Sequence, residues 1–158
     1  MLSSCIFMIL YYNYCITLSK AQTKGAINMQ QVLDFLNKAN VYYLATTDGD
    51  QPHVRPLGFV MEHDGKLMFC TGNNKPMFKQ MLKNPKVELC ACIGQETLRI
   101  CGKVVVSTTL ETKQKALDYM PMLKELYNEN DGVFEIFYID EATAILCDMA
   151  GNNQELPL

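Results

Sequence analysis

Hydrophobic and polar residues follow two different periods along this chain, and short polar clusters separate the segments. Apolar residues at helical spacing, such as Val32, Phe35 and Leu36, predict an amphipathic helix. Stretches rich in β-branched and aromatic residues, many of them alternating with polar ones, predict strands. The helices are expected over residues 29–39, 76–83 and 110–120, and the strands over residues 41–47, 52–62, 67–70, 86–93, 97–107, 133–139 and 142–148.

Turn signals connect most of these strands as hairpins. The clusters Asp48-Gly49-Asp50 and His63-Asp64-Gly65-Lys66 are strong turn sequences, and two successive hairpins make an antiparallel meander. Gly102, inside the longest strand, predicts a bulge of the kind that bends a sheet into a barrel. No strand–helix–strand rhythm recurs. We therefore expect an α+β fold, mainly β: an antiparallel barrel of six or seven strands with short flanking helices.

The two ends of the chain lie outside the predicted domain, which we place at residues 29–148. Residues 1–28 form a leader, uncharged from Met1 to Ser19, and residues 149–158 form a tail that we expect to be frayed. The leader is compatible with a signal peptide, a membrane anchor or a translation start upstream of the natural one. It lacks a positively charged first segment and is short for a membrane span. We favour Met29 as the natural initiator.

Composition narrows the class of protein. With 49% hydrophobic and 20% charged residues, the chain has an ordinary globular composition. A formal net charge of −3 without a basic run argues against nucleic-acid binding. The cysteine count of 7 is odd and includes no C-x-x-C pair. We therefore expect the cysteine thiols to be reduced and the protein to be cytoplasmic. We expect no stable membrane association.

The histidines and cysteines support neither a metal site nor a nucleophilic triad. His53 and His63 are the only histidines and lack ligand spacing, so no metal is expected. No serine or cysteine lies in a nucleophile-elbow motif. We interpret His53 as a half-exposed strand residue and His63 as a turn residue. The catalytic residues stay unknown.

The stretch from Leu67 to Asn84 carries the first candidate chemistry. A buried strand there leads through a polar turn, Thr71-Gly72-Asn73-Asn74, into a helix that begins with Lys75. Free backbone N–H groups and the helix dipole favour an anion at such a place, and Lys79 shares a face with Lys75. The alternative is that Thr71 or Asn74 caps the helix and both lysines are solvated.

Arg55, on the preceding strand, is the second candidate. If the two strands are hairpin neighbours, Arg55 lies beside Cys70 and Thr71 and offers a rigid fork to a phosphate or a ring carbonyl. The alternative is a cross-strand ion pair with a carboxylate such as Glu62 or Glu88.

These segments together resemble a known family. The run LATTDGDQPHVRPLGFVMEHDGKLMFCTGNNKPMFKQMLKNPKVEL, followed by LRICGKVVV, is similar to the flavin-binding split barrels related to pyridoxamine 5′-phosphate oxidase. Within that family it looks closest to short proteins grouped with nitroimidazole reductases. The resemblance covers roughly residues 29–148. It implies a split β-barrel and a homodimer with two FMN sites at the subunit interface.

The resemblance also assigns roles to residues of this chain. The strand arginine and the residues after it run beside the flavin, and the next strand end, turn and helix start hold its ribityl phosphate. The corresponding residues here are Arg55, Pro56 and Leu57 for the first set and Cys70, Thr71, Asn74 and Lys75 for the second, with Lys79 as an addition.

The chain departs from the oxidase itself at several positions. The oxidase usually has a serine followed by adjacent arginine and lysine at the phosphate, where this chain reads Lys75-Pro76-Met77. The usual lysine five residues after the strand arginine is Val60, and no C-terminal arginine is present to grip pyridoxamine phosphate. Oxidation of vitamin B6 is therefore not carried over to this chain.

Two functions remain as hypotheses. The first is an FMN-dependent oxidoreductase that passes electrons between reduced flavin and a small-molecule acceptor such as a nitroaromatic or a quinone. The second is a protein of the same fold that binds or sequesters flavin or haem without turnover. The sequence does not separate them.

Overall fold

The computed structural model describes residues 29–158, and over these residues eight antiparallel strands form one sheet. The order in the sheet is β2-β1-β5-β6-β7-β4-β3, and β8 pairs with the second half of β7, beyond the residues that pair with β4. The predicted leader, residues 1–28, lies outside the described residues. The strands are β1 (Tyr42–Asp48), β2 (Gln51–Leu57), β3 (Val60–His63), β4 (Lys66–Gly72), β5 (Lys86–Ile93), β6 (Glu96–Val106), β7 (Phe134–Asp148) and β8 (Asn153–Pro157).

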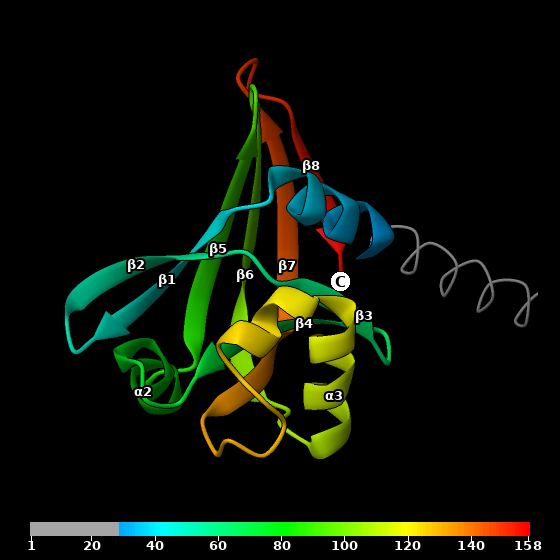
Figure 1. Ribbon diagram of the computed structural model, residues 1–158. Coiled ribbons are helices and arrows are strands. Elements are labelled where there is room, and N and C mark those ends of the chain that lie inside the picture. Colours follow the sequence, from blue (N-terminus) through cyan, green and yellow to red (C-terminus); the bar gives the residue numbers. More distant parts are fainter. Residues whose placement is uncertain (1–28) are drawn as a thin grey trace, which may run out of the picture.

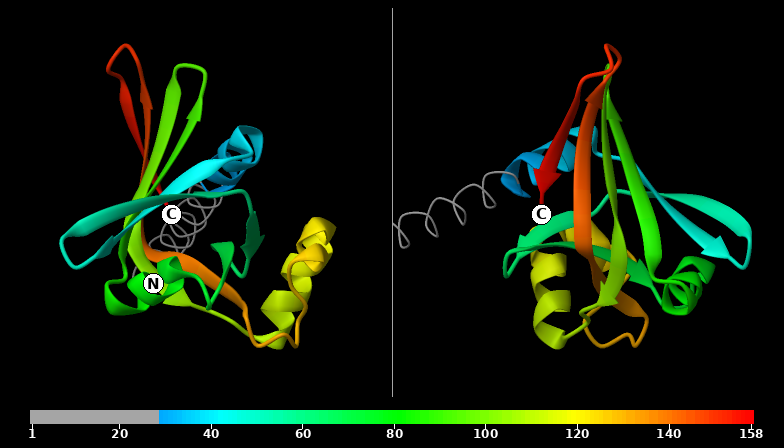
Figure 2. Two further views of the ribbon diagram at one scale, coloured as in Figure 1. Left: turned by 60° about the vertical axis from the view of Figure 1, so that its left-hand side comes forward. Right: turned by 180° about the vertical axis from the view of Figure 1, so that it is seen from behind.

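Three helices and one 3₁₀ helix flank this sheet in the part of the chain that the structure describes. A helix that includes residues 29–39 precedes β1, α2 (Pro76–Lys83) follows β4, and α3 (Leu110–Tyr119) continues into the 3₁₀ helix η1 (Pro121–Glu125). In Figures 1 and 2, α2 and α3 lie at one end of the molecule, while the β5–β6 and β7–β8 turns project at the other. Proline determines where α2 lies, because Pro76 starts it and Pro85 follows its last residues.

The predicted fold class is confirmed. The fold is α+β and mainly β, the strands are antiparallel, and the sheet is coiled but open: β2 and β3 are its two ends and do not pair with each other. This opening makes the barrel a split one. The structure has eight described strands, one or two more than the six or seven expected.

Two hydrophobic clusters hold the sheet and helices together. The first fills the inside of the coiled sheet, where Tyr42 packs edge-on against Phe69 and Phe69 stacks on Phe137 with ring centres 5.6 Å apart. The second lies between β3, β4, β7 and α3, and includes the fully buried Phe134 and Ala116. Burial of these apolar side chains is the main stabilising contribution to the fold.

The prediction of a single strand over residues 52–62 is wrong, because the structure has two strands there, β2 and β3. β2 pairs with β1 and β3 pairs with β4, and the chain changes partner at Gly58 and Phe59. A side chain at residue 58 would approach the Asn40 carbonyl oxygen to 3.3 Å, so glycine suits this close passage. Strand alternation breaks there, because the consecutive residues Phe59, Val60 and Met61 are all buried.

The last two predicted strands, residues 133–139 and 142–148, are a single strand. Both halves pair with β6, so the polar pair between them is a bulge in β7 and not a hairpin turn. Glu141 there has a φ of 49°. The bulge lies opposite Gly102, where the register shifts between Cys101 and Lys103, which confirms the irregularity expected at that glycine.

The expectation of a frayed tail is also wrong. Residues 153–157 form β8, which pairs with β7 in register from Thr143↔Pro157 to Cys147↔Asn153. Leu156 is buried in the first cluster, and this contact explains the ordering of the segment. In the part of the chain that the structure describes, no helix is long and apolar enough to cross a membrane.

Candidate functional site

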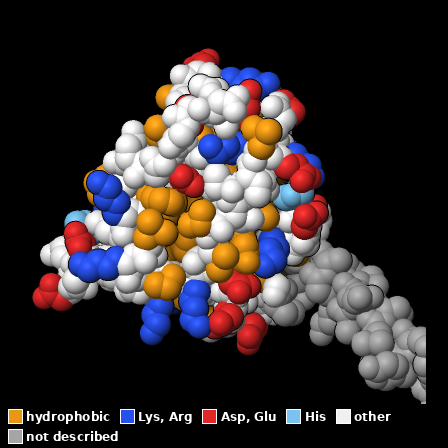
Figure 3. Space-filling model, turned by 90° about the horizontal axis from the view of Figure 1, so that it is seen from below, with side chains coloured by type: hydrophobic (Ala, Val, Ile, Leu, Met, Phe, Trp, Pro, Cys, Tyr) orange, Lys and Arg blue, Asp and Glu red, His pale blue; other side chains and the backbone are white. Residues whose placement is uncertain are grey.

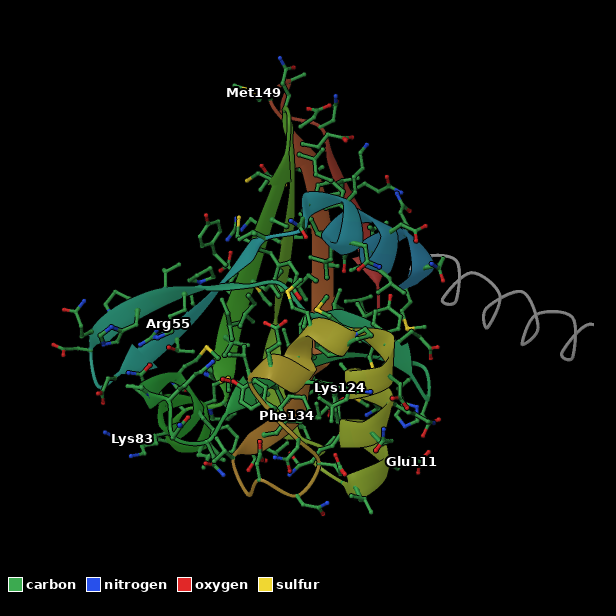
Figure 4. All side chains as sticks on the ribbon, viewed as in Figure 1. Arg55, Lys83, Glu111, Lys124, Phe134 and Met149 are labelled. Atoms are coloured by element: carbon green, nitrogen blue, oxygen red, sulfur yellow. The ribbon has the colours of Figure 1, made fainter. Side chains whose placement is uncertain are left out.

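A pocket of about 230 Å³ lies where β2, the end of β4 and the start of α2 meet. Figure 4 shows Arg55 on the β1–β2 hairpin above α2, and the face that carries α2 is seen from below in Figure 3, with hydrophobic side chains at its centre and lysine and arginine side chains around them. The site therefore combines an apolar floor with basic groups. The lining residues are Arg55, Pro56, Leu57, Thr71, Lys75, Pro76 and Met77.

The start of α2 differs from the capped helix that was the alternative. Lys75 is the N-cap residue, its backbone is extended, and no side chain caps the helix. The interpretation that Thr71 or Asn74 caps the helix is therefore wrong. Lysine is a poor cap because it offers no acceptor to the first N–H groups, so the helix start stays available for another acceptor.

The backbone around this helix start is less free than the sequence suggested. The N–H groups of Asn73, Lys75 and Phe78 donate to the carbonyl oxygens of Val133, Gly72 and Lys75 at 2.9, 3.0 and 3.1 Å. Pro76 has no N–H at all. Most of the attraction for an anion here must consequently come from side chains.

Among the residues that the structure describes, Thr71 gives the clearest indication that this pocket suits a polar ligand. Thr71 is only 2% exposed, and its hydroxyl has no hydrogen-bond partner among the described residues. An unpaired buried hydroxyl costs about 1–3 kcal/mol, and groups of this kind are rare in folded proteins. Because Thr71 lines the pocket, a ligand acceptor or donor placed there would remove that cost.

Arg55 is held by a hydroxyl and not by a carboxylate. Its Nη1 donates to Thr46 Oγ1 at 3.2 Å. The ion pair proposed as the alternative is not made, since the Glu88 carboxylate instead accepts from Arg99 at 2.5 Å. Arg55 therefore enters the pocket with its positive charge not neutralised by an acid, and with donors left for a ligand.

Lys75 adds the second positive charge. Its Nζ lies 5.7 Å from the centre of the Tyr127 ring, within the range of a cation–π contact. Tyr127 in turn stacks on Phe134, with ring centres 4.6 Å apart. Lys79 and Asn74 are exposed nearby but do not line the pocket.

Cys70 lies on the other face of β4 from Thr71. It packs against the second hydrophobic cluster, and burial raises the pKa of its thiol to about 12, although the positive charge of Lys75 lowers it in part. A thiol with that pKa stays protonated at neutral pH and is a poor nucleophile. Its contribution near the site is packing.

The structure thus brings five of the eight predicted site residues together and separates three. Arg55, Pro56, Leu57, Thr71 and Lys75 line one pocket, whereas Cys70, Asn74 and Lys79 lie beside it. The strand arrangement that brings these residues together differs from the expected hairpin. β2 and β4 are not paired neighbours in the sheet, and they meet at the opening of the split barrel.

Two residues that sequence reasoning missed also belong to the site. Thr46 on β1 accepts from Arg55, and its own hydroxyl donates to Gln80 Oε1 of α2 at 2.8 Å. Both are buried. Only the polar character of Thr46 and Gln80 at inward-facing positions of their elements was a signal, and such residues are too common to identify a site.

The histidines lie away from this pocket. Neither His53 nor His63 lines it. His63 is not a turn residue as expected but the buried last residue of β3, with Nδ1 3.1 Å from Lys115 Nζ. Among the described residues, no group of three or more His, Cys, Asp or Glu side chains is arranged to hold a metal ion.

A second pocket of about 220 Å³ between the β3–β4 turn and β7 is a weaker candidate. Its charged groups are already engaged: Lys66 Nζ lies 3.9 Å from Asp140 and 3.6 Å from the centre of the Tyr138 ring. Glu141 is paired with Lys103 at 2.6 Å. The pocket beside α2 is the better site for two reasons. Among the described residues, Arg55 and Lys75 form no salt bridge, and the buried Thr71 hydroxyl has no hydrogen-bond partner.

Comparison with known proteins identifies the family of this architecture. The sequence profile described as pyridoxamine 5′-phosphate oxidase matches residues 29–143. A solved NimC/NimA family protein from Clostridium acetobutylicum is 39% identical, with a TM-score of 0.76 over 81% of this chain and 93% of its own. No curated protein matches the chain.

Two more distant structures share the fold. A pyridoxamine 5′-phosphate oxidase-related, FMN binding protein from Nostoc punctiforme is 17% identical, with a TM-score of 0.58 over 84% of this chain and 87% of its own. A heme binding protein from Mycobacterium smegmatis is 14% identical, with a TM-score of 0.59 over 76% of this chain and 56% of its own. At these identities the likeness concerns the fold alone.

Proposed function

The chain belongs to the pyridoxamine 5′-phosphate oxidase family, and on that premise we propose that the pocket beside α2 binds FMN by its phosphate. The observation that carries the proposal is the unpaired, buried hydroxyl of Thr71 in a pocket that Arg55 and Lys75 also line. Arg55 and Lys75 supply positive charge, and Thr71 supplies a donor. A phosphate has about two negative charges and three strong acceptor oxygens, which suits this set.

The residues present fit the rest of the cofactor as well. Pro56 and Leu57 follow Arg55 on β2 and line the pocket, and Met77 adds an apolar side chain from α2. Apolar surface of this kind favours an aromatic ring and excludes water from it. Arg55, Pro56 and Leu57 would therefore follow the cofactor from its phosphate toward its ring, with Asn74 and Lys79 at the rim of the phosphate end.

We propose an oxidoreductase activity for the loaded protein, with electrons passing to a small nitroaromatic or quinone acceptor. FMN, when bound, supplies the electron chemistry. The residues of this chain bind and orient it, and keep its phosphate away from water. The resemblance to proteins grouped with nitroimidazole reductases supports a nitroaromatic acceptor, and the 39% identity with the Clostridium acetobutylicum NimC/NimA family protein agrees with it.

A homodimer that shares the cofactor between subunits is part of the proposal. The pocket of about 230 Å³ is smaller than the roughly 300–1,000 Å³ of sites that enclose a ligand of this kind, so a second wall is needed. Two apolar side chains of the β1–β2 hairpin are exposed: Tyr43, which is paired with the lining residue Pro56, at 51%, and Val54 at 64%. A second copy of the chain would cover both.

The proposed location is the cytoplasm, because the cysteines of the described residues are free thiols. Such thiols persist in a reducing compartment. They are Cys70, Cys90, Cys92, Cys101 and Cys147.

Binding of haem or flavin without turnover is the second candidate. The Mycobacterium smegmatis protein of this fold is described as heme binding, which keeps haem as an alternative ligand. The pocket of this chain favours FMN over haem, because neither histidine lines it and two cationic groups do. Haem usually requires an axial ligand such as histidine, and its propionates are weaker anions than a phosphate.

The visible absorbance spectrum of the purified protein tests the proposal. We expect flavin bands, and a supernatant released by boiling that matches FMN and not FAD or riboflavin, near one equivalent per subunit. A Soret band on addition of haemin, without flavin, would favour the second candidate. A colourless protein that binds neither added ligand would overturn both. Reoxidation of the photoreduced protein by a nitroaromatic or a quinone then tests the activity.

A further inference from the structure

Two buried polar side chains and the partly buried Arg55 form a continuous chain of hydrogen bonds from α2 to the pocket. Gln80, on the inner face of α2, is 6% exposed, and Thr46, on β1, is 2% exposed. The Thr46 hydroxyl donates to Gln80 Oε1 at 2.8 Å and accepts from Arg55 Nη1 at 3.2 Å. The chain of contacts ends at a side chain that lines the candidate site.

The direction of these bonds is determined by the chemistry of the groups. A guanidinium only donates, so Thr46 must accept from Arg55. The single hydroxyl proton of Thr46 is then directed to the carbonyl oxygen of Gln80. With the Gln80 amide reversed, the Thr46 oxygen would accept from both neighbours and the Thr46 proton would lose its acceptor on Gln80, so the observed orientation is the one that satisfies all three groups.

From this arrangement we propose that Thr46 and Gln80 are positioning residues that hold the Arg55 guanidinium in place for the ligand phosphate. The inference rests on the proposed function for the identity of that ligand. An arginine side chain has many rotamers, and their loss on binding weakens affinity unless they are restricted beforehand. Here the restriction comes from α2, the helix whose start also presents Lys75. In this proposal α2 positions both positively charged side chains of the site, Arg55 and Lys75.

The fold does not depend on this chain of hydrogen bonds alone. Asn84, at the end of α2, donates from Nδ2 to Thr47 Oγ1 at 2.8 Å and forms a separate link between the helix and β1. Met77, Phe78 and Met81 anchor the same helix in the core. A change at Thr46 therefore leaves α2 docked and tests the position of Arg55.

The test compares Thr46→Val, which keeps the shape and removes the hydroxyl, with Thr46→Ser, which keeps the hydroxyl. We expect Thr46→Val to weaken FMN binding about three- to tenfold and to leave riboflavin binding unchanged, because riboflavin lacks the phosphate. Thr46→Ser should stay within about twofold of wild type. In an Arg55→Ala background, Thr46→Val should have no further effect on FMN affinity. An equal loss with and without Arg55 would overturn the positioning role.

A second measurement needs no flavin. Arg55 and Arg99 are the only arginines of the chain, so guanidinium NMR signals of the ligand-free protein are simple to assign. The hydrogen bond to Thr46 should slow rotation of the Arg55 guanidinium, and Thr46→Val or Gln80→Met should release it. Arg99, which pairs with Glu88, is the internal control and should not change.

The two measurements separate the possible failures. Wild-type protein that does not bind FMN contradicts the proposed function, while the NMR result still confirms or overturns the restriction of Arg55. Wild-type protein that binds FMN, with Arg55 signals equally mobile in wild type and Thr46→Val, overturns the inference alone.

Discussion

The ε-ammonium of Lys75 lies 5.7 Å from the centre of the Tyr127 ring, although 52 positions of sequence separate the two residues. Tyr127 follows η1 and is itself fixed by stacking on the buried Phe134. The aromatic face thereby contacts Lys75, the N-cap residue of α2. The second hydrophobic cluster consequently supports a residue of the candidate site.

Replacement of Tyr127 tests that support. Tyr127→Leu should weaken FMN binding about two- to fivefold, because a cation–π contact at an exposed site contributes about 0.5–1 kcal/mol. Tyr127→Phe keeps the ring and should bind as wild type. Fluorescence titration with FMN measures both variants. Equal weakening in Tyr127→Phe would assign the effect to the tyrosine hydroxyl and contradict the contact described here.

Thr71→Val should separate stability from binding. The ligand-free protein should become more stable by about 1 kcal/mol, since the substitution removes a buried hydroxyl that has no partner. The same change should weaken FMN binding about five- to tenfold, because the ligand loses that hydrogen bond. Urea unfolding and FMN titration measure the two effects. A less stable Thr71→Val protein would show that the hydroxyl has a partner in the free protein, and Thr71→Ser is the control.

Lys75 and Lys79 should differ although one turn of helix separates them. Lys75 lines the pocket and Lys79 does not. Lys75→Met should weaken FMN binding about tenfold or more, because a charge-assisted hydrogen bond contributes about 1.5–3 kcal/mol. Lys79→Met should weaken it less than about threefold, as expected for an exposed charge. Riboflavin affinity should stay unchanged in both, and equal losses for FMN would move the phosphate outward along α2.

Gly102→Ala should destabilise the fold without any effect on the pocket. A Cβ atom at residue 102 would lie 2.5 Å from Ile139 Cγ2 and 2.6 Å from the Asp140 carbonyl oxygen. The φ of Gly102 is not positive, so the cost comes from space and not from backbone strain. We expect a loss of about 2 kcal/mol or more in the free energy of unfolding. The exposed neighbour Cys101→Ala should change it by less than about 0.5 kcal/mol.

The buried Cys70 thiol should make stability depend on alkaline pH. Burial raises its pKa from the ordinary 9.0 to about 12 in the folded protein. Above pH 9 the unfolded chain loses this proton while the folded chain keeps it, so the free energy of unfolding falls as pH rises through that window. One group contributes a slope of up to about 1.4 kcal/mol per pH unit.

Urea unfolding between neutral pH and pH values above 9 measures this slope. Cys70→Ala should reduce it, whereas Met68→Leu, a non-titrating change on the same face of β4, should leave it as in wild type. An undiminished slope in Cys70→Ala would assign the alkaline loss of stability to other groups, such as the buried Tyr42, whose pKa burial also raises.

The elements whose ends depend on local chemistry could be predicted from the amino-acid sequence. Proline bounds α2 at Pro76 and stops it before Pro85, and the bounds predicted for α2 and for β5 agree with the structure. Gly102 indicated the position of the bulge. A Cβ atom at residue 102 would lie only 2.6 Å from the Asp140 carbonyl oxygen, so glycine suits this position. Arg55 and Lys75 were also predicted from the sequence, because the family pattern surrounds them, and both line the pocket beside α2.

Which of these elements pair or pack together depends on the tertiary structure. The partner change at Gly58, the continuity of β7 and the strand β8 all depend on pairing between segments far apart in sequence, for which local periodicity contains no signal. The same holds for Thr46 and Gln80, which are 34 residues apart and become partners because α2 packs against β1. A hydrogen bond between distant residues is made after the chain has folded, so the residues that position Arg55 were visible only in three dimensions.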